Sequence, residues 1–514
     1  MNFKTVLTGF VLLLEFAFSV ERALSASGMF PKMPAAANVY VVAVRPERAD
    51  VKMTVWALQG LINQRSAEVY TINNPWDWEP LKKCGKPFEE LNELTGDDAG
   101  LRNLFKKYQG QVKKMFIYDL ADDWTWFLAS MAAAQQDGIP VTEPVRDELI
   151  SEFGWKGEIE DFRNRWSNRI EAYDWALQNL MPNCCRRVIF TIKMGQPMDY
   201  AVAAKGFIFW LNLQNERAEI QKIFSAGGYR VGTSLMGYGN GGDRLNDIAN
   251  PYGIGYVTGC YANASFWTSF ANTTHTQSPG HAVPAEPGKI YASIMWSDGD
   301  NLEFDQNPLY KFWHDPAHGQ IPVATALSPT LQELNPQLLD WYYSHMTTND
   351  ELMCGPSGFQ FVEIQDFNDK MFPAWCNLTC RWCADAGFHT VRIWSAPYDS
   401  PKYILYMKNC GFTGVLGEHP MTQPGFPPKI DTYAAANQER LFERFVSVSP
   451  NPQRPVFVSF TPIVKGFYQG DHGYTAIKRQ IDRVEAAYPG RYVFLLPKDE
   501  FATIRGYYHL PPGP

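Results

Sequence analysis

The sequence predicts an α/β protein in which an N-terminal α/β region precedes a C-terminal (β/α) barrel-like domain of seven or eight strands. Two observations support this prediction. Strands and helices alternate over residues 38–250, and a second alternating series follows a segment at 271–288 that is rich in Thr, Ser, Pro and Gly. Such alternation is typical of parallel sheets. For the second series, an open doubly wound sheet is the alternative to a barrel.

The chain has 514 residues and divides into four expected segments. Residues 1–26 have the pattern of a secretory signal peptide, with an early lysine, an apolar run and a small-x-small site. An N-terminal α/β region with room for two or three subdomains follows at 27–270. Residues 271–288 form the expected linker, and 289–514 the catalytic domain. We therefore expect a secreted or periplasmic protein that has no membrane segment after signal cleavage, because no later apolar run is long enough to span a bilayer.

The expected strands are short and apolar. In the N-terminal region they cover 38–44, 68–72, 115–118 and 188–192, with helices at 53–62, 124–136 and 200–211. In the C-terminal series they cover 290–296, 321–327, 358–364, 389–394, 412–416, 455–460 and 491–495. Two C-terminal helices have recognisable ends. Asn335-Pro336 predicts an N-cap followed by a first-turn proline, and Gly387 predicts the C-cap of a helix that begins near Pro373.

Composition narrows the range of ligands. The net charge is −8 and no block of Lys or Arg stands out, so a nucleic-acid partner is not expected. Aromatic residues make up 14% of the chain, including 16 Trp. Aromatic rings combine a large apolar face with a polar edge, which suits stacking on sugar rings. The composition thus favours an oligo- or polysaccharide substrate.

The stretch from Ile290 to Asn301 is the most informative part of the sequence. A near-continuous apolar strand over 290–296 runs into Asp298, a turn glycine and Asp300. Functional side chains gather at the carboxyl ends of parallel strands. An Asp-Gly turn that caps its own backbone is the plain alternative for these residues.

Further polar residues follow other expected strands and should meet Asp298 and Asp300 at one barrel mouth. Glycosidic hydrolysis requires one protonated and one ionised carboxyl group at the scissile bond. We expect Asp298, Asp300 and Glu363 to be catalytic, with Asp300 or Glu363 as the general acid. The expected substrate-binding residues are Trp296, Asn301, Phe359, Phe361, Asp366, Glu418 and His419. Other candidates at strand ends are Ser395, Tyr398, Asp399, Lys465, Asp471 and His472.

Three alternatives accompany this hypothesis. Cys376, Cys380 and Cys383 have the Cys-x3-Cys-x2-Cys spacing of a cluster-binding motif, although the same spacing places them on one helix face. His314 and His318, together with the Asp-Gly-Asp turn, would suit a metal-dependent polysaccharide deacetylase. The third alternative is a carbohydrate-binding protein without catalysis. For the favoured hydrolase we expect no cofactor and no metal.

Several segments resemble a family of glycoside hydrolases named for a G-x-G-Y-x-Y-P motif. The similar segments are Leu58-Gln-Gly-Leu-Ile-Asn-Gln, Asp199-Tyr-Ala-Val-Ala-Ala-Lys205, Ser297-Asp-Gly-Asp-Asn-Leu302 and Leu327-Ser-Pro-Thr-Leu-Gln-Glu-Leu-Asn-Pro336. The naming motif falls on 356–362, where Gly358 is kept while Phe359 and Phe361 replace the tyrosines. The resemblance implies an exported, carbohydrate-active protein, and the altered motif implies a different specificity or binding without cleavage.

Overall fold

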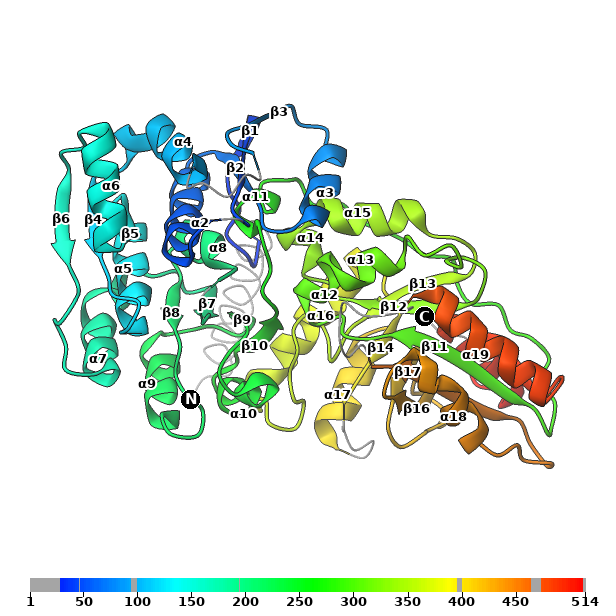
Figure 1. The fold of residues 1–514 in the computed structure, drawn as a ribbon. Helices are drawn as coiled ribbons and strands as arrows, with labels where there is room; N and C mark the ends of the chain where they lie inside the picture. The colour runs from blue at the N-terminus through cyan, green and yellow to red at the C-terminus, as the bar shows by residue number, and fades with distance from the viewer. Residues whose placement is uncertain are drawn as a thin grey trace, which may run out of the picture.

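The computed structural model describes residues 28–45, 47–93, 99–193, 195–394, 400–463 and 473–511. Figure 1 shows two parts side by side: an N-terminal region (residues 28–270) built on three small sheets, and a barrel (residues 290–511). Residues 1–26, the expected signal peptide, lie outside the described residues.

The three N-terminal sheets are all parallel. The first has the order β2-β1-β3, the second β5-β4-β6 and the third β10-β9-β7-β8. Their strands are β1 (Ala35–Ala43), β2 (Ala67–Ile72), β3 (Phe88–Glu90), β4 (Lys114–Ile117), β5 (Gly138–Val141), β6 (Glu158–Asp161), β7 (Val188–Thr191), β8 (Phe207–Phe209), β9 (Ser234–Gly237) and β10 (Gly255–Thr258). The helices are α2 (Ala49–Asn63), α3 (Trp78–Lys83), α4 (Ala99–Tyr108), α5 (Asp123–Gln135), α6 (Glu143–Phe153), α7 (Arg169–Asn179), α8 (Met198–Ala203), α9 (Arg217–Ala226), α10 (Asn246–Ala249) and α11 (Ala264–Trp267).

Helix α2 is the centre of this region because it is apolar on nearly all sides and is buried along most of its length. It packs against α8 at Gly60, where an added Cβ would lie only 2.8 Å from the Val202 Cβ. Two helices can come this close only where one of them carries no side chain.

The barrel is a closed parallel sheet of seven strands. The strands are β11 (Ile290–Trp296), β12 (Val323–Leu327), β13 (Asp350–Cys354), β14 (Thr390–Arg392), β15 (Gly414–Gly417), β16 (Lys429–Ala435) and β17 (Val456–Pro462). Strand β11 closes the ring because it pairs with both β12 and β17. An eighth strand, β18 (Tyr492–Leu495), pairs with the first half of β11. The prediction of a barrel of seven or eight strands is confirmed, and the open sheet is wrong.

The helices around the barrel are α12 (Leu302–Gln306), α13 (Pro308–Phe312), α14 (Leu331–Leu334), α15 (Pro336–His345), α16 (Phe372–Ala386), α17 (Pro401–Asn409), α18 (Leu441–Ser447), α19 (Tyr474–Ala487) and α20 (Pro497–Tyr507). Two of the expected caps are confirmed. The Asn335 side chain accepts the Leu338 amide at the start of α15, and Gly387 ends α16 with a φ of 74°.

Helix α20 closes the amino end of the barrel. Its Phe501 and Ile504 join an interior cluster with Met295, Met353 and Leu416. Gly414 leaves room for the Phe501 ring, which would overlap any Cβ at that position. With one end filled by a helix, the carboxyl ends of the strands form the open end of the barrel.

Two expected elements differ from the structure, and one barrel strand has no expected counterpart. The strand expected at 358–364 is irregular, and the third barrel strand is β13, whose polar Asp350 and Glu351 are nevertheless buried. Strand β16 was not expected, because its sequence mixes charged and polar residues with apolar ones. The helix expected over 200–211 stops at Ala203, and β8 follows.

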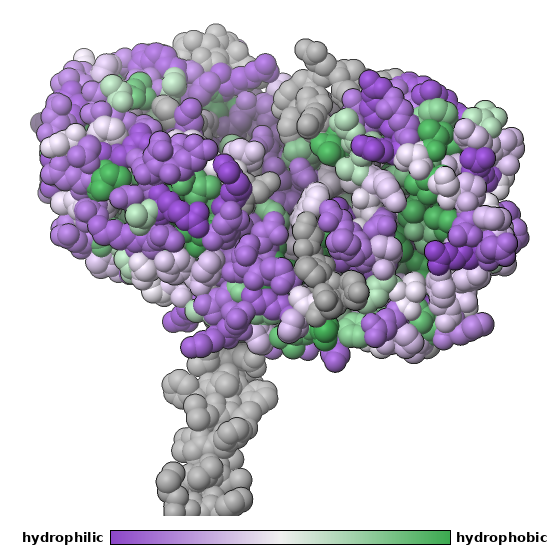
Figure 2. All heavy atoms as spheres, turned by 90° about the horizontal axis from the view of Figure 1, so that it is seen from below, coloured by the Kyte–Doolittle hydropathy of each residue, from purple (hydrophilic) through white to green (hydrophobic). Residues whose placement is uncertain are grey.

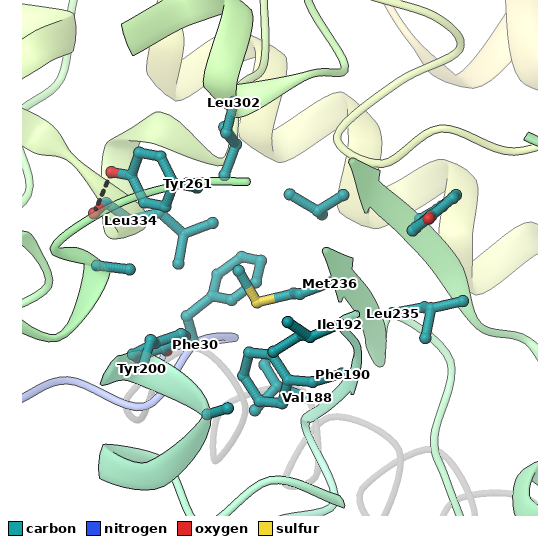
Figure 3. Packing of buried hydrophobic residues seen from close by; sticks show 14 of the residues in the cluster. Phe30, Val188, Phe190, Ile192, Tyr200, Leu235, Met236, Tyr261, Leu302 and Leu334 are labelled. Atoms are coloured by element: carbon teal, nitrogen blue, oxygen red, sulfur yellow. Dashed lines mark hydrogen bonds between the residues drawn. The ribbon is translucent and has the colours of Figure 1, made fainter. Parts of the chain in front are cut away.

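The N-terminal region and the barrel share one hydrophobic core. Figure 3 shows buried residues of this core from both parts, among them Phe190 of β7 and Met236 of β9 from the N-terminal region and Leu302 and Leu334 from the barrel. The Tyr261 hydroxyl donates to the Leu334 carbonyl at 2.9 Å (Figure 3). A shared core of this kind holds the two parts in a fixed relation.

The segment between the two parts has no helix or strand over 271–286 and lies along the barrel. The Gln277 side chain donates to the carbonyls of Leu352 and Gly387, both at 2.7 Å.

On the face shown in Figure 2, hydrophobic residues occur as separate patches in a largely hydrophilic surface. Within the described ranges, no helix has the length and apolar character needed to cross a membrane.

Candidate active site

A cavity of about 330 Å³ lies where the carboxyl ends of strands from both parts meet. Its lining residues follow β9, β11, β13 and β14 or end β10, and they are Tyr238, Thr258, Asp298, Asp300, Asn301, Phe361, Glu363 and Trp394. The three expected catalytic residues are therefore brought together, with Asn301 and Phe361 beside them. Sequence reasoning did not identify Tyr238, Thr258 and Trp394.

The Asp-Gly-Asp turn is held by its own hydrogen bonds. The Asn301 amide donates to the Asp298 carbonyl at 2.9 Å, and the Ser297 hydroxyl donates to Asp298 Oδ1 at 3.2 Å. The Asn301 side-chain oxygen accepts the amides of Glu303 and Phe304 and so caps helix α12. The capping turn and the expected functional turn are thus the same structure: Asn301 caps the helix, while both aspartates line the cavity.

Two glycines let the turn lie directly against neighbouring backbone. A Cβ on Gly299 would lie 2.5 Å from the Leu327 amide nitrogen at the end of β12. A Cβ on Gly355, just after β13, would lie 2.6 Å from the Gly299 carbonyl carbon and 2.8 Å from the Asp300 nitrogen. These contacts are with backbone, which cannot move aside as a side chain can. The positions of Asp298 and Asp300 therefore depend on the absence of side chains at both glycines.

A further carboxyl group, that of Asp305, lies near the two aspartates of the turn but does not line the cavity. Asp305 of α12 is buried, and its Oδ2 accepts the Ser328 amide at 3.1 Å. Burial raises the pKa of Asp305 well above its usual value, and the negative charges of Asp300 and Asp298 raise it further. Burial likewise raises the pKa of Glu303, whose carboxylate accepts the Cys260 amide at 3.1 Å.

The N-terminal region takes part in the site directly. The Thr258 hydroxyl donates to the Asp300 carboxylate at 3.2 Å, and the Phe361 and Tyr256 backbones exchange hydrogen bonds of 2.8 and 2.9 Å. The Glu363 amide donates to Asn250 Oδ1 at 2.8 Å. Segments that carry Asp300 and Glu363 are thus both attached to the N-terminal region.

Two of the expected aromatic platforms are corrected by the structure. Trp296 is fully buried on the outside of the barrel, where it stacks on Phe312 with ring centroids 4.7 Å apart. Phe359 is also fully buried and stacks on Trp382 at 5.8 Å. Neither ring lines the cavity, because both fill the space between the barrel and its helices. Phe361 does line it.

The remaining expected substrate-binding residues lie outside the cavity. Asp366, Glu418 and His419 are exposed and do not line it. The charge of Glu418 acts instead on Arg392 and Lys429, whose pKa values burial lowers and Glu418 partly restores. The candidates Ser395, Tyr398, Asp399, Lys465, Asp471 and His472 lie outside the described residues.

The two metal hypotheses are not supported by the arrangement of their ligands. His314 bonds Glu79 at 3.2 Å and His318 bonds Asp350 at 3.1 Å, so the two imidazoles have separate partners. Neither lines the cavity that holds Asp298 and Asp300. Among the described residues, no group of three or more His, Cys, Asp or Glu side chains could hold a metal ion.

The cysteine motif has a structural role. Cys380 forms a disulfide with Cys410, and this bond removes one of the three thiolates that a cluster would need. Cys376 and Cys383 are buried free thiols on the same helix. The cluster hypothesis is therefore wrong, and the disulfide joins α16 to the residue that ends α17.

Comparisons with known proteins agree with this architecture. A solved structure of a protein named "putative hydrolase", from Bacteroides thetaiotaomicron VPI-5482, superposes with a TM-score of 0.79 at 18% identity, covering 94% of this chain and 98% of that chain. At this identity the likeness shows a shared fold. A structure named as a polysaccharide deacetylase from Mycobacterium smegmatis covers 47% of this chain and 98% of its own, at 10% identity and a TM-score of 0.33, which is too low to support an argument. No curated protein matches the chain.

Two family matches fall on the two parts of the molecule. Residues 288–438 match the family described as "GxGYxYP putative glycoside hydrolase C-terminal domain". Residues 112–184 match the one described as "GxGYxYP_N second domain". The resemblance seen in the sequence is thereby confirmed over these two ranges, which are similar to the second N-terminal domain and the C-terminal domain of the GxGYxYP family.

Proposed function

We propose that this protein is a glycoside hydrolase that cleaves an oligo- or polysaccharide with the carboxyl groups at the barrel mouth. The observation that carries the proposal is that Asp298, Asp300 and Glu363, from two different strand ends, line one cavity. Cleavage requires a protonated carboxyl group beside the leaving oxygen and an ionised one that attacks the sugar or activates water.

The hydrogen bonds to the carboxyl groups indicate which of them is the ionised group and which is the general acid. Asp300 accepts the Thr258 hydroxyl, and a hydrogen bond donated to a carboxylate stabilises its ionised form. We assign Asp300 as the ionised partner and Glu363 as the general acid. Asp298, whose Oδ1 accepts the Ser297 hydroxyl, supports the charge at the reacting carbon.

The test measures sugar release from a glycan panel by wild type, Asp300→Asn, Glu363→Gln and Asp366→Asn. Asp366 is the matched control because it lies on the same loop as Glu363 but is exposed and outside the cavity. We expect the first two variants to lose at least about 10²-fold in kcat and the control to keep wild-type activity. Equal binding by all proteins without any release would instead identify a non-catalytic carbohydrate-binding protein.

An activated aryl glycoside separates the two roles. Its leaving group departs without a proton, so we expect Glu363→Gln to retain activity on it while Asp300→Asn does not. The reverse result would exchange the assignments. Loss of activity in both variants on the activated substrate would remove Glu363 from the acid role.

We also propose that the protein is exported and loses residues 1–26. The signal-like pattern of those residues supports this, as does the Cys380–Cys410 disulfide, because disulfides persist in oxidising compartments. The N-terminal sequence of protein recovered from outside the cytoplasm tests the proposal. An intact Met1 would overturn it.

A further inference from the structure

Tyr238 is exceptional among the large hydrophobic side chains of the described residues. It is 52% exposed, more than any other exposed large hydrophobic residue there, and it lines the cavity that holds the three carboxyl groups. An exposed aromatic ring in a polar cavity offers apolar surface to a ligand.

The loop that carries Tyr238 requires glycine at two positions and is hydrogen-bonded beside the tyrosine. Gly237 and Gly241 have φ of 110° and 139°, which residues with a side chain rarely adopt. A Cβ at Gly237 would overlap the Thr191 carbonyl oxygen. The Gly239 amide donates to the buried Tyr256 hydroxyl at 2.8 Å. The Gly237 carbonyl accepts the Gly259 amide at 3.0 Å, so the backbone is hydrogen-bonded on both sides of Tyr238.

A second aromatic residue enters the same cavity from the barrel. Trp394 follows β14 and is only partly buried. The guanidinium of Arg392 lies 4.5 Å from its ring centroid, within cation–π distance. Arg392 is itself 3% exposed, so it supports the indole from the protein interior rather than from solvent.

We infer that Tyr238 and Trp394 form an aromatic subsite that binds sugar rings next to the reacting bond, with one wall supplied by the N-terminal region and one by the barrel. This inference rests on the proposed function and specifies its ligand: a glycan of at least two sugar units whose rings present an apolar face. Stacking of such a face on Tyr or Trp contributes affinity through buried apolar area while the hydroxyls at the ring edge stay hydrated. The N-terminal region is therefore part of the substrate site.

The inference predicts effects on binding rather than on the chemical step. In Tyr238→Ala we expect the Kd for di- to tetrasaccharides, and the KM, to rise roughly tenfold while kcat changes less than about twofold. Tyr238→Phe should bind like wild type because the ring is kept. Tyr433→Ala is the matched control, since Tyr433 is 36% exposed but lies outside the cavity. Trp394→Ala should behave like Tyr238→Ala.

Titration calorimetry in an Asp300→Asn background measures binding, and sugar release by the corresponding single variants measures hydrolysis. A Kd for Tyr238→Ala within about twofold of its parent, or an equal rise in Tyr433→Ala, overturns the aromatic subsite. If wild-type protein binds the glycans, Tyr238→Ala weakens that binding, and no sugar is released, the hydrolase proposal alone is overturned. Wild-type protein that neither binds nor cleaves any member of the panel overturns both.

Discussion

The hydroxyl of Thr258 donates to the carboxylate of Asp300 across the junction between the N-terminal region and the barrel. The oxygen–oxygen distance is 3.2 Å, and the same hydroxyl lies 3.2 Å from the Asp300 carbonyl. Thr258 ends β10 and is 3% exposed, so its position is set by the N-terminal sheet. The Asp300 carboxylate belongs to the barrel, but the hydroxyl that donates to it belongs to Thr258 of the N-terminal region.

Thr258→Val should reduce activity more than stability. Valine keeps the shape of threonine but cannot donate, and a hydrogen bond to a charged group contributes about 1.5–3 kcal/mol. We expect kcat/KM to fall by roughly tenfold or more, while Thr258→Ser stays close to wild type. Steady-state kinetics of the two variants, together with their Tm values, check this. Equal activity of Thr258→Val and Thr258→Ser would show that the hydroxyl does not position Asp300.

Gly355→Ala should displace the Asp-Gly-Asp turn. The added methyl group would lie 2.6 Å from the Gly299 carbonyl carbon, and backbone on both sides leaves it no space. A shift of about 1 Å at a catalytic group can cost on the order of 10²-fold in rate. Kinetics and thermal unfolding measure the effect, with Gly110→Ala as the control because a Cβ there meets nothing within 4 Å. Wild-type kcat in Gly355→Ala would mean that the turn tolerates displacement.

The sequence was sufficient to predict the barrel and the meeting of Asp298, Asp300 and Glu363. Parallel strands end at one edge, so residues that follow different strands converge whatever the exact strand boundaries are. The strand expected to carry Glu363 was misplaced, because 358–364 alternates like a strand while β13 contains buried Asp350 and Glu351. The glutamate nevertheless reaches the mouth, since the loop after β13 ends there.

The aromatic residues show what the sequence could not supply. Trp296 lies on a strand with two apolar faces, and such a pattern predicts burial without indicating which face meets the helices. Tyr238 and Thr258 line the same cavity as Glu363, although both lie more than a hundred positions from Glu363 in the sequence. No local periodicity encodes such a contact. The glycines around Tyr238 were the available local signal, since closely spaced glycines indicate a specially shaped turn.

Removing the Cys380–Cys410 disulfide should destabilise the barrel. The bond closes a loop with a sequence separation of 30, for which the chain-entropy estimate is about 3–4 kcal/mol. We expect Cys410→Ser to unfold at lower denaturant concentration than wild type and to be insensitive to reductant, while wild type shifts to the variant's midpoint when reduced. Cys184→Ala, at a buried free thiol, controls for loss of a cysteine. Identical midpoints for oxidised and reduced wild type would contradict the expectation.

Glu351 should make the folded state more stable in mild acid than at neutral pH. Burial raises the pKa of Glu351 from 4.5 to about 7, while the Thr390 hydroxyl and the Lys498 amide, which donate to its carboxylate, partly oppose the rise. Because the folded state holds the proton more tightly than the unfolded state, the contribution is complete below about pH 4.5 and is lost as pH rises through 7. The loss for this one group is on the order of 2–3 kcal/mol.

Glu351→Gln isolates that contribution. Glutamine can accept the Lys498 amide and donate to the Thr390 hydroxyl, so it imitates the protonated acid at every pH. Buried Asp77 and Asp199, whose pKa values burial raises to about 6, titrate in both proteins and cancel in the comparison. Urea unfolding across the pH range should show wild type losing stability relative to Glu351→Gln as pH rises toward 7. Parallel stability curves for the two proteins would mean that Glu351 is ionised in the fold without a penalty.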